Sequence, residues 1–214
     1  MAEKVVIGNA TLYHGDCIDV LPLLAEIGAL VSDPPYPNAA GLFLDGVPRA
    51  RLVVGSPPAD HVIAFWDEMD QPYSPLPLVA RHAWYRTNTN RPDNYEAIYE
   101  WHADGKKRAS RIFPFSVVAV GLTGCTQATG HPTQKHEGLM QTLVKRTAGR
   151  VFDPFMGSGS TGVACAMERR PFVGVERDRR WFDVACERIS RAQAQGRMFS
   201  DEPAPAPEQQ ALEL

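Results

Sequence analysis

The spacing of apolar and polar positions changes character several times along the chain. Short apolar runs at 150–153 and 172–176 predict two strands, and positions from about 180 to 195 repeat with the period of an amphipathic helix. Small residues from about 159 to 169, between the two strands, predict another helix. This order of strand, turn, helix, strand and helix is typical of a doubly wound, mostly parallel α/β sheet, which is the fold class we expect.

The N-terminal half carries similar but weaker signals. Residues 28–32 predict a strand and residues 16–26 a short helix limited by Pro22. Alternating positions at 82–87 and 95–102 flank a polar turn and predict a β-hairpin. Residues 37–60 are rich in Gly and Pro and predict a long loop, which in a compact domain is usually functional.

Length and composition indicate one globular domain at 1–199, followed by an acidic Pro/Ala tail at 200–214 that we expect to be disordered. No apolar run approaches the ~20 residues of a membrane span, and the N-terminus lacks the pattern of a signal peptide. We therefore expect a cytoplasmic protein. The four cysteines are too scattered for a disulfide framework or a zinc site, and we expect no metal. Two of them, Cys165 and Cys186, fall on apolar helical faces and are expected in the core.

The formal net charge of -3 is unevenly distributed. Residues 201–214 contain four acidic and no basic residues, so they carry -4 and residues 1–200 carry +1. Segment 81–111 holds seven basic residues against four acidic ones. Because local charge matters more than the total for attracting a polyanion, the composition does not exclude a nucleic-acid partner.

A glycine-rich turn joins the predicted strand at 150–153 to the helix of small residues. Residues 157–162 read Gly-Ser-Gly-Ser-Thr-Gly, a G-x-G-x-x-G, and Glu176 ends the next strand about twenty positions on. In nucleotide-binding α/β folds such glycines let the backbone approach the ligand, and the acid accepts hydrogen bonds from ribose hydroxyls. Asp153 would repel a pyrophosphate and favour a cationic amino-acid portion of the ligand. The turn predicts an adenosine-containing cofactor; a tight turn without a ligand is the alternative.

The tetrad Asp33-Pro34-Pro35-Tyr36 follows the first predicted strand. Two prolines fix φ and remove two N–H donors, so the segment is stiff and its carbonyls are free to accept hydrogen bonds. The acid and the aromatic ring would supply an acceptor for an exocyclic amine and a flat surface for the base. A base must be flipped out of a duplex to reach such a slot. A plain turn after a strand is the other interpretation.

Three segments together resemble the motifs of the amino-methyltransferase family of DNA methylases, which act on adenine N6 or cytosine N4. They are the tetrad at 33–36, His-Pro-Thr-Gln-Lys at 131–135 and Asp-Pro-Phe-Met-Gly-Ser-Gly-Ser-Thr at 153–161. Their order is that of the family's permuted β group, and the resemblance covers most of residues 11–190. It implies a Rossmann-like fold of the S-adenosylmethionine-dependent methyltransferase type. It also implies S-adenosylmethionine as cofactor, DNA as partner and adenine N6 as the favoured target.

The resemblance assigns individual roles. Asp33 and the Pro34 carbonyl are expected to bind the target amine, within a catalytic corner completed by Pro35 and by Tyr36, which stacks on the base. Cofactor contacts are expected from Asp16, Lys135, Asp153, Phe155, Gly157, Ser158, Gly159, Thr161 and Glu176. Asp16 is equally suited to capping a helix. These roles require the Asp33 corner and the Gly157 turn to lie on the same side of the molecule.

The chain departs from the family pattern in two places. His136 follows Lys135 where the family usually has Pro, so the local backbone is expected to differ. Only about thirty residues separate the predicted hairpin from His131, whereas members with strict sequence specificity generally carry a larger recognition insert there. We therefore expect a specificity that is short, relaxed or completed by a second subunit, for which a homodimer is one arrangement.

The middle of the chain, about 37–130, is the expected DNA-contact region. Basic residues there can contact phosphates, and aromatic side chains can stack on unpaired bases. Trp84 and Tyr99 are expected in the core instead, and Asn88 and Asn90 in the turn. The residues predicted to contact nucleic acid are Arg86, Arg91, Lys106, Lys107, Arg108 and Arg111.

Several other functions fit parts of the pattern. N4-cytosine methylation and an RNA-directed methyltransferase share the same motifs, whereas glutamine methyltransferases typically have Asn at the position of Asp33. A non-catalytic nucleic-acid-binding module would not need the tetrad, and a nicotinamide oxidoreductase would need a hydride-transfer site that is not evident. No Cys follows the prolines, which argues against C5-cytosine chemistry through a thiolate. The pattern is compatible with a bacterial or phage-encoded modifying enzyme.

Overall fold

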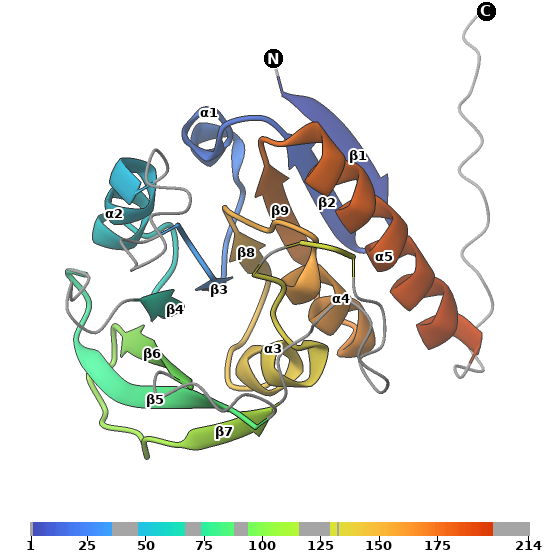
Figure 1. Cartoon of the computed structure of the whole chain (residues 1–214). Coiled ribbons are helices and arrows are strands. Elements are labelled where there is room, and N and C mark those ends of the chain that lie inside the picture. The colour runs from blue at the N-terminus through green and yellow to red at the C-terminus, as the bar shows by residue number, and fades with distance from the viewer. Residues whose placement is uncertain are drawn as a thin grey trace, which may run out of the picture.

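The computed structural model describes residues 2–35, 47–66, 74–87, 94–115, 129–131 and 133–198. Within these ranges nine strands form one sheet, in the order β1-β2-β9-β8-β3-β4-β6-β5-β7 (Figure 1). The strands are β1 (Glu3–Ile7), β2 (Ala10–His14), β3 (Ala29–Ser32), β4 (His61–Trp66), β5 (Leu78–Arg86), β6 (Tyr95–His102), β7 (Ile112–Phe115), β8 (Val151–Asp153) and β9 (Phe172–Glu176).

The central strands β2, β9, β8, β3 and β4 pair in parallel, as does β7 with β5. Antiparallel pairing is confined to β1 with β2 and to β6, which pairs with both β4 and β5. The carboxyl ends of β9, β8, β3 and β4 therefore meet at one edge of the sheet, where ligands bind in folds of this kind.

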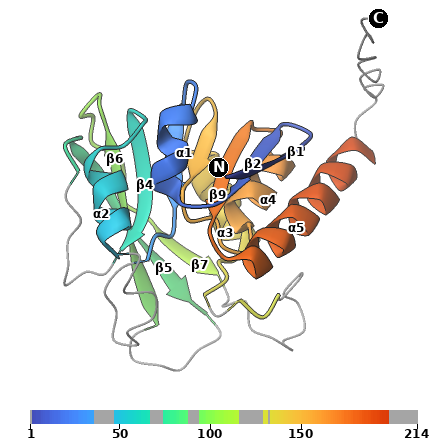
Figure 2. The same ribbon diagram turned by 90° about the horizontal axis from the view of Figure 1, so that it is seen from above.

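Helices cover both faces of the sheet, as a doubly wound fold requires (Figure 2). On one face lie α1 (Cys17–Val20), the 3₁₀ turn η1 (Leu21–Leu23) and α2 (Val47–Gly55), which pack with β4 and β6 in one core cluster. On the other lie α3 (Glu137–Val144), α4 (Ser160–Met167) and α5 (Arg179–Met198), which contribute to the second cluster. The helix after β3 and the helix after β8 thus lie on opposite faces.

The expected α/β fold is confirmed, and most predicted elements fall where the pattern placed them. β9 has the predicted bounds, and β5 and β6 form the predicted antiparallel hairpin. The prediction of a continuous loop at 37–60 was wrong in part, because 47–55 forms α2. Pro48 stands in the first turn of that helix, where its missing N–H costs no hydrogen bond.

The predicted core residues are buried. Trp84, Tyr99 and Cys165 are at most 4% exposed, and Cys186 packs partly buried against the core. Cys125 and the tail at 201–214 lie outside the described residues, so the separate tail stays a prediction. No helix among the described residues is long and apolar enough to span a membrane.

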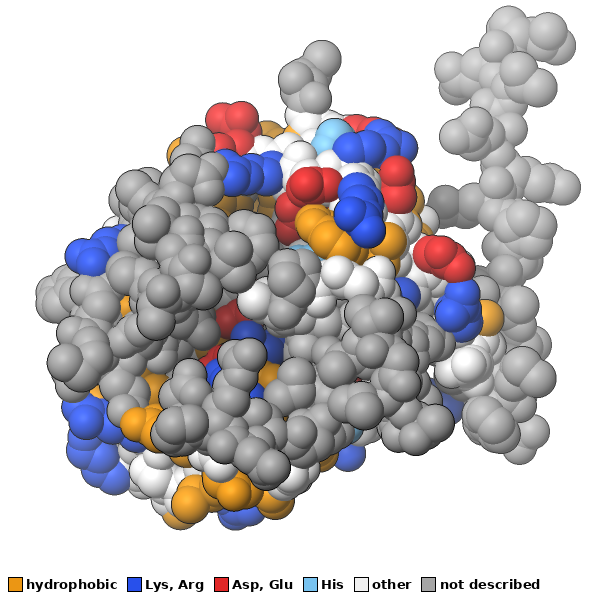
Figure 3. All heavy atoms as spheres, viewed as in Figure 1, with side chains coloured by type: hydrophobic (Ala, Val, Ile, Leu, Met, Phe, Trp, Pro, Cys, Tyr) orange, Lys and Arg blue, Asp and Glu red, His pale blue; other side chains and the backbone are white. Residues whose placement is uncertain are grey.

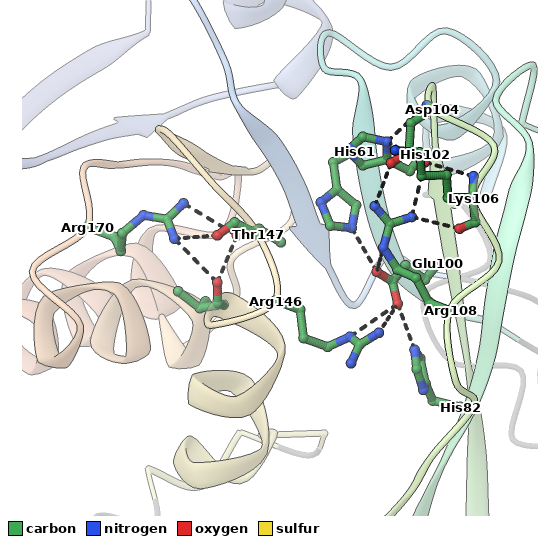
Figure 4. Close-up of polar contacts among 11 residues, drawn as sticks. His61, His82, Glu100, His102, Asp104, Lys106, Arg108, Arg146, Thr147 and Arg170 are labelled. Atoms are coloured by element: carbon green, nitrogen blue, oxygen red, sulfur yellow. Dashed lines mark hydrogen bonds and ion pairs between the residues drawn. The ribbon is translucent and has the colours of Figure 1, made fainter.

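A buried carboxylate ties the antiparallel part of the sheet to the segment after α3. The Glu100 side chain on β6 is fully buried and accepts hydrogen bonds from His61 at 3.0 Å, His82 at 2.9 Å and the Arg146 Nη2 at 2.7 Å (Figure 4). Burial alone would raise the pKa of Glu100, but these hydrogen bonds hold it well below its ordinary value. Glu100 therefore stays ionised and joins four separate segments.

Candidate functional site

The double-proline corner and the glycine-rich turn lie side by side at the carboxyl edge of the sheet. β3, which runs into Asp33, pairs in parallel with β8, which runs into the Gly157 turn. Ser32 Oγ donates a 2.6 Å hydrogen bond to Asp153 Oδ1 and so joins the ends of the two strands. In the space-filling view, acidic and basic side chains meet in a recess near the middle of this edge (Figure 3). The arrangement required by the sequence hypothesis is present.

Asp33 belongs to a cluster of four charged side chains. The ammonium of Lys135, just before α3, lies 2.5 Å from Asp33 Oδ2 and 3.1 Å from Glu96 Oε2. Glu96, on β6, also pairs with Arg86 of β5 at 2.5 Å. Lys135 was predicted to contact the cofactor; the structure places its ammonium on the Asp33 carboxylate, and a cofactor contact stays a prediction.

The second carboxylate oxygen of Asp33 is not engaged by the other described residues. Oδ1 is buried and has no hydrogen-bond partner among the described residues. Burial raises the pKa of Asp33 to about 6; Lys135 opposes the rise and Glu96 adds to it. Pro34 is buried beside it and Pro35 is half-buried. Tyr36 lies outside the described residues.

Asp153 is 2% exposed, and protein donors occupy both of its carboxylate oxygens. Oδ1 accepts from Ser32 and, at 3.1 Å, from the Phe155 amide, while Oδ2 accepts from Thr161 Oγ1 at 2.5 Å. Burial raises its pKa to about 6, against these three hydrogen bonds. Its predicted contact with the cofactor is untested. In the described structure it connects the Asp33 corner to the first turn of α4.

The glycine-rich turn has the backbone that its glycines were expected to allow. Gly157 and Gly159 have φ of 49° and 83°, in the left-handed region that favours glycine. A Cβ on Gly159 would also come within 2.9 Å of Ala185 Cβ on α5. Glu176 at the end of β9 accepts from the amides of Gly157 at 2.9 Å and Asp178 at 2.8 Å. A carboxylate held in this way keeps acceptor capacity for further donors such as ribose hydroxyls.

Arg188 on α5 holds the turn from behind, a role that the sequence analysis did not anticipate. Its side chain is 3% exposed; Nη1 donates to the Ser158 carbonyl at 2.5 Å and to Ser158 Oγ at 3.1 Å. Nη2 donates to Glu137 Oε1 at 2.7 Å. Arg188 thereby joins the glycine turn to the first turn of α3, two residues after Lys135.

The remaining predicted cofactor residues lie around the same edge. Asp16 caps α1 by accepting from the Ile18 amide at 3.0 Å, which confirms the helix-cap interpretation and leaves the adenine contact a prediction. Phe155 packs partly buried against the core cluster under α1 and α2. His136 caps α3 by accepting a hydrogen bond from the Gly138 amide. Its φ is -66°, an angle that proline also adopts, so a histidine at the family's usual proline position requires no change in φ.

His131 and Trp181 flank the turn and were not assigned roles from the sequence. Their rings meet edge to face with centroids 4.5 Å apart, and His131 lies beside Gly157. Burial lowers the pKa of His131 to about 4, helped by Lys135 and Arg188, so its ring is neutral at physiological pH.

The structure does not bring the basic segment together with Asp33. Lys106, Lys107 and Arg108 follow the end of β6, beside the start of β4, at the opposite edge of the sheet. The nine-residue β5 separates the two edges by roughly 25 Å. Lys107 Nζ donates to the Leu78 carbonyl at 2.6 Å and Arg108 pairs with Asp104 at 3.1 Å. Of the other predicted phosphate contacts, Arg111 is exposed, Arg86 lies at the Asp33 edge, and Arg91 is outside the described residues. Phosphate binding by all six stays a prediction.

The sheet order, the helices on both faces and the site at the carboxyl edge define a Rossmann-like fold of the S-adenosylmethionine-dependent methyltransferase type. A family model described as "DNA methylase" matches residues 66–187, more than half of the chain, and the chain therefore belongs to that family. The matched range contains Lys135, the Gly157 turn and Glu176, and Asp33 precedes it.

Curated relatives agree with this family. The chain is 29% identical over 121 residues to the type II methyltransferase M2.LlaDCHI of Lactococcus lactis subsp. cremoris, covering 53% of this chain and 42% of the relative. It is also 29% identical over 110 residues to the type II methyltransferase M2.MboI of Moraxella bovis, covering 49% and 38%. The matches thus span about two fifths of each relative.

Solved structures share the fold. The M1.HpyAVI-SAM complex superposes with a TM-score of 0.64 at 21% identity, over 84% of this chain and 99% of that one. The cytosine-N4-specific PvuII DNA methyltransferase superposes with a TM-score of 0.65 at 14% identity, over 86% and 87%.

Proposed function

We propose that the protein is a DNA methyltransferase that transfers the methyl group of S-adenosylmethionine to the exocyclic amine of a flipped-out base. The observation that carries this proposal is the buried Oδ1 of Asp33, which has no hydrogen-bond partner within the described part of the chain and lies beside a glycine turn of cofactor-binding type. The DNA methylase family and the type II methyltransferase relatives support it.

The residues at the carboxyl edge fit the cofactor. The turn at 157–159 has glycine at two left-handed positions, and Glu176 retains acceptor capacity for ribose hydroxyls. Bound there, S-adenosylmethionine supplies an electrophilic methyl carbon on a positively charged sulfur. The acidic residues Asp33 and Asp153 lie at the same edge and favour a cationic ligand.

Asp33 is the residue that acts on the amine. Its carboxylate accepts a hydrogen bond from the amine, as does the Pro34 carbonyl, and this favours a pyramidal nitrogen whose lone pair is free to attack. S-adenosylmethionine held at the Gly157 turn would supply the methyl carbon to this lone pair, and the electron pair of the broken carbon–sulfur bond would stay on sulfur. The methylated amine then loses a proton, for which a carboxylate with a pKa of about 6 is a suitable acceptor.

Adenine N6 is the first target that we propose, because extruding an adenine breaks fewer base-pair hydrogen bonds than extruding a cytosine, and extrusion opposes binding. Cytosine N4 is the second, because a cytosine-N4-specific enzyme is among the structures with the same fold. Both amines would meet Asp33 in the same way.

The test is transfer of isotope-labelled methyl groups to unmodified DNA, followed by mass spectrometry of the nucleosides. Asp33→Ala should lower turnover by at least about 10²-fold while cofactor affinity, measured by calorimetry, stays within a fewfold. N6-methyladenine in the digest would support the first target and N4-methylcytosine the second. Turnover that survives Asp33→Ala would exclude the assigned role.

A further inference from the structure

The Lys135 ammonium lies between two carboxylates that come from distant parts of the chain. Asp33 follows β3, whereas Glu96 begins the second strand of the β5–β6 hairpin. The Lys135 side chain is only 6% exposed, and its ammonium lies 4.8 Å from the centre of the Phe65 ring and 5.7 Å from that of Trp84. The two carboxylates therefore provide its close anionic partners in a site largely closed to water.

The ion pair with Asp33 opposes amine binding without blocking it. Lys135 contacts Oδ2 at 2.5 Å, whereas Oδ1 is the oxygen left for the amine. An ammonium on one oxygen draws charge from the other and so weakens the hydrogen bond that the amine would donate. Glu96 Oε2, 3.1 Å from the same ammonium, reduces this effect because it offers a second place for the charge.

Arg86 restrains the Glu96 carboxylate. It pairs with Glu96 Oε1 at 2.5 Å, which holds the carboxylate in place with Oε2 3.1 Å from the Lys135 ammonium. Arg86, Glu96, Lys135 and Asp33 thus form a row of alternating charges from the hairpin to the catalytic corner. The hairpin is consequently part of the catalytic site and not only a surface for DNA.

We propose that Glu96 is a positioning residue that shares Lys135 with Asp33 and takes over the ammonium when a target amine binds Asp33. The proposal rests on the proposed methyltransferase function. It adds a residue of β6 that the motifs do not contain.

The proposal predicts how Asp33 titrates. The groups that act on it are Lys135, Glu96 and Asp153; the first favours its anion and the other two disfavour it. Glu96→Gln removes one repulsive charge from Asp33 and one of the two carboxylates that contact the lysine. The pKa of Asp33 should therefore fall, and Lys135 should compete more strongly with the amine.

The experiment measures single-turnover methyl transfer between pH 5 and pH 8 at saturating cofactor. In the wild type, the rate should fall as Asp33 is protonated near pH 6. Glu96→Gln should move this acidic limb down by about one pH unit and lower the plateau rate by about tenfold. Glu96→Asp keeps the negative charge, so the acidic limb of its pH–rate profile should lie close to that of the wild type. Glu187→Gln on α5 removes an exposed carboxylate paired with Arg191 and should leave the profile unchanged.

An acidic limb that stays in place or moves up in Glu96→Gln would overturn the proposal, as would an equal plateau rate in that variant and the wild type. A second readout does not need turnover: the ¹³C NMR titration of the Asp33 carboxyl carbon, assigned by its loss in Asp33→Asn. Its midpoint should fall in Glu96→Gln, and an unchanged midpoint would also overturn the proposal. If the wild type methylates no DNA but the midpoint falls, the proposed function fails while the coupling of Glu96 to Asp33 stands.

Discussion

Thr161→Val tests whether the buried Asp153 carboxylate depends on its hydroxyl donors. Thr161 Oγ1 donates to Asp153 Oδ2 at 2.5 Å, and the two residues are 3% and 2% exposed. Valine has nearly the shape of threonine, so the substitution removes the hydrogen bond without opening a cavity. Asp153 Oδ2 would then be left without this donor in a site that water does not reach.

The magnitude follows from the charge on the acceptor. A hydrogen bond to an ionised group contributes about 1.5–3 kcal/mol, so the variant should lose roughly 2 kcal/mol of unfolding free energy at pH 7.5. For a domain of this size that corresponds to a fall in Tm of about 4–8 °C. Urea denaturation followed by circular dichroism would measure the loss.

The loss should depend on pH. The pKa of Asp153 is raised from 3.8 to about 6 in the folded protein, so the folded state binds the proton more tightly than the unfolded state. The contribution of this group to stability is therefore present at low pH and is lost as pH rises through about 6. Removing Thr161 raises the pKa further, and the difference between variant and wild type should grow from pH 4.5 to pH 7.5.

The matched control is Thr142→Val on α3, whose hydroxyl donates to the Gly138 carbonyl at 2.8 Å. That acceptor does not titrate, so the control should lose less stability and show no pH dependence. A loss in Thr161→Val that is the same at both pH values would refute ionisation of Asp153 as its cause. A loss below about 0.5 kcal/mol would refute the hydrogen bond itself.

Two further substitutions test the supports of the site. Arg188→Met should cost about 3–5 kcal/mol in urea denaturation, because it breaks a buried pair with Glu137 and leaves the Ser158 carbonyl without this donor. Cofactor affinity by calorimetry should fall about tenfold, and unchanged affinity would mean that the arginine does not shape the turn. Glu100→Gln should also cost about 3–5 kcal/mol, since a neutral amide cannot balance Arg146 beside the two histidines. Single-turnover transfer by the folded fraction should not change; a slower rate would connect Glu100 to the catalytic edge.

The spacing of apolar and polar residues predicted the helices and strands in which it repeats regularly, and it missed those in which it does not. β9 and the β5–β6 hairpin carry apolar runs or alternation bounded by turn residues. β4 has six buried residues in succession, and a short run of this kind does not distinguish a strand from a helix. α3 was missed because its motif was interpreted as a ligand contact, although His136 supplies the cap that starts it.

The candidate site was predictable where a residue belongs to a motif and not where its partner is distant in sequence. Asp33, Lys135 and Gly157 could be named from their neighbours in the chain. Ser32 and Asp153 are 121 residues apart in the chain. Lys135 precedes α3 and Glu96 lies on β6, and only the folded arrangement of these segments brings the two side chains into contact. The basic segment after β6 shows the same limit, because charge density along the chain does not reveal which edge of the sheet the charges occupy.

The position of Asp153 explains why a costly buried carboxylate stands between the two halves of the site. β3 and β8 are neighbours, but the helices that follow them, α2 and α4, leave to opposite faces of the sheet. This divergence opens the crevice in which folds of this kind bind ligands, and it also means that no crossover helix joins the two strand ends there. The main-chain pairing of β3 with β8 ends at Leu30 and Phe152, and side-chain hydrogen bonds extend the connection beyond it. Asp153 does so with Ser32 on one side and Thr161 on the other, so one carboxylate joins the Asp33 corner to the first turn of α4.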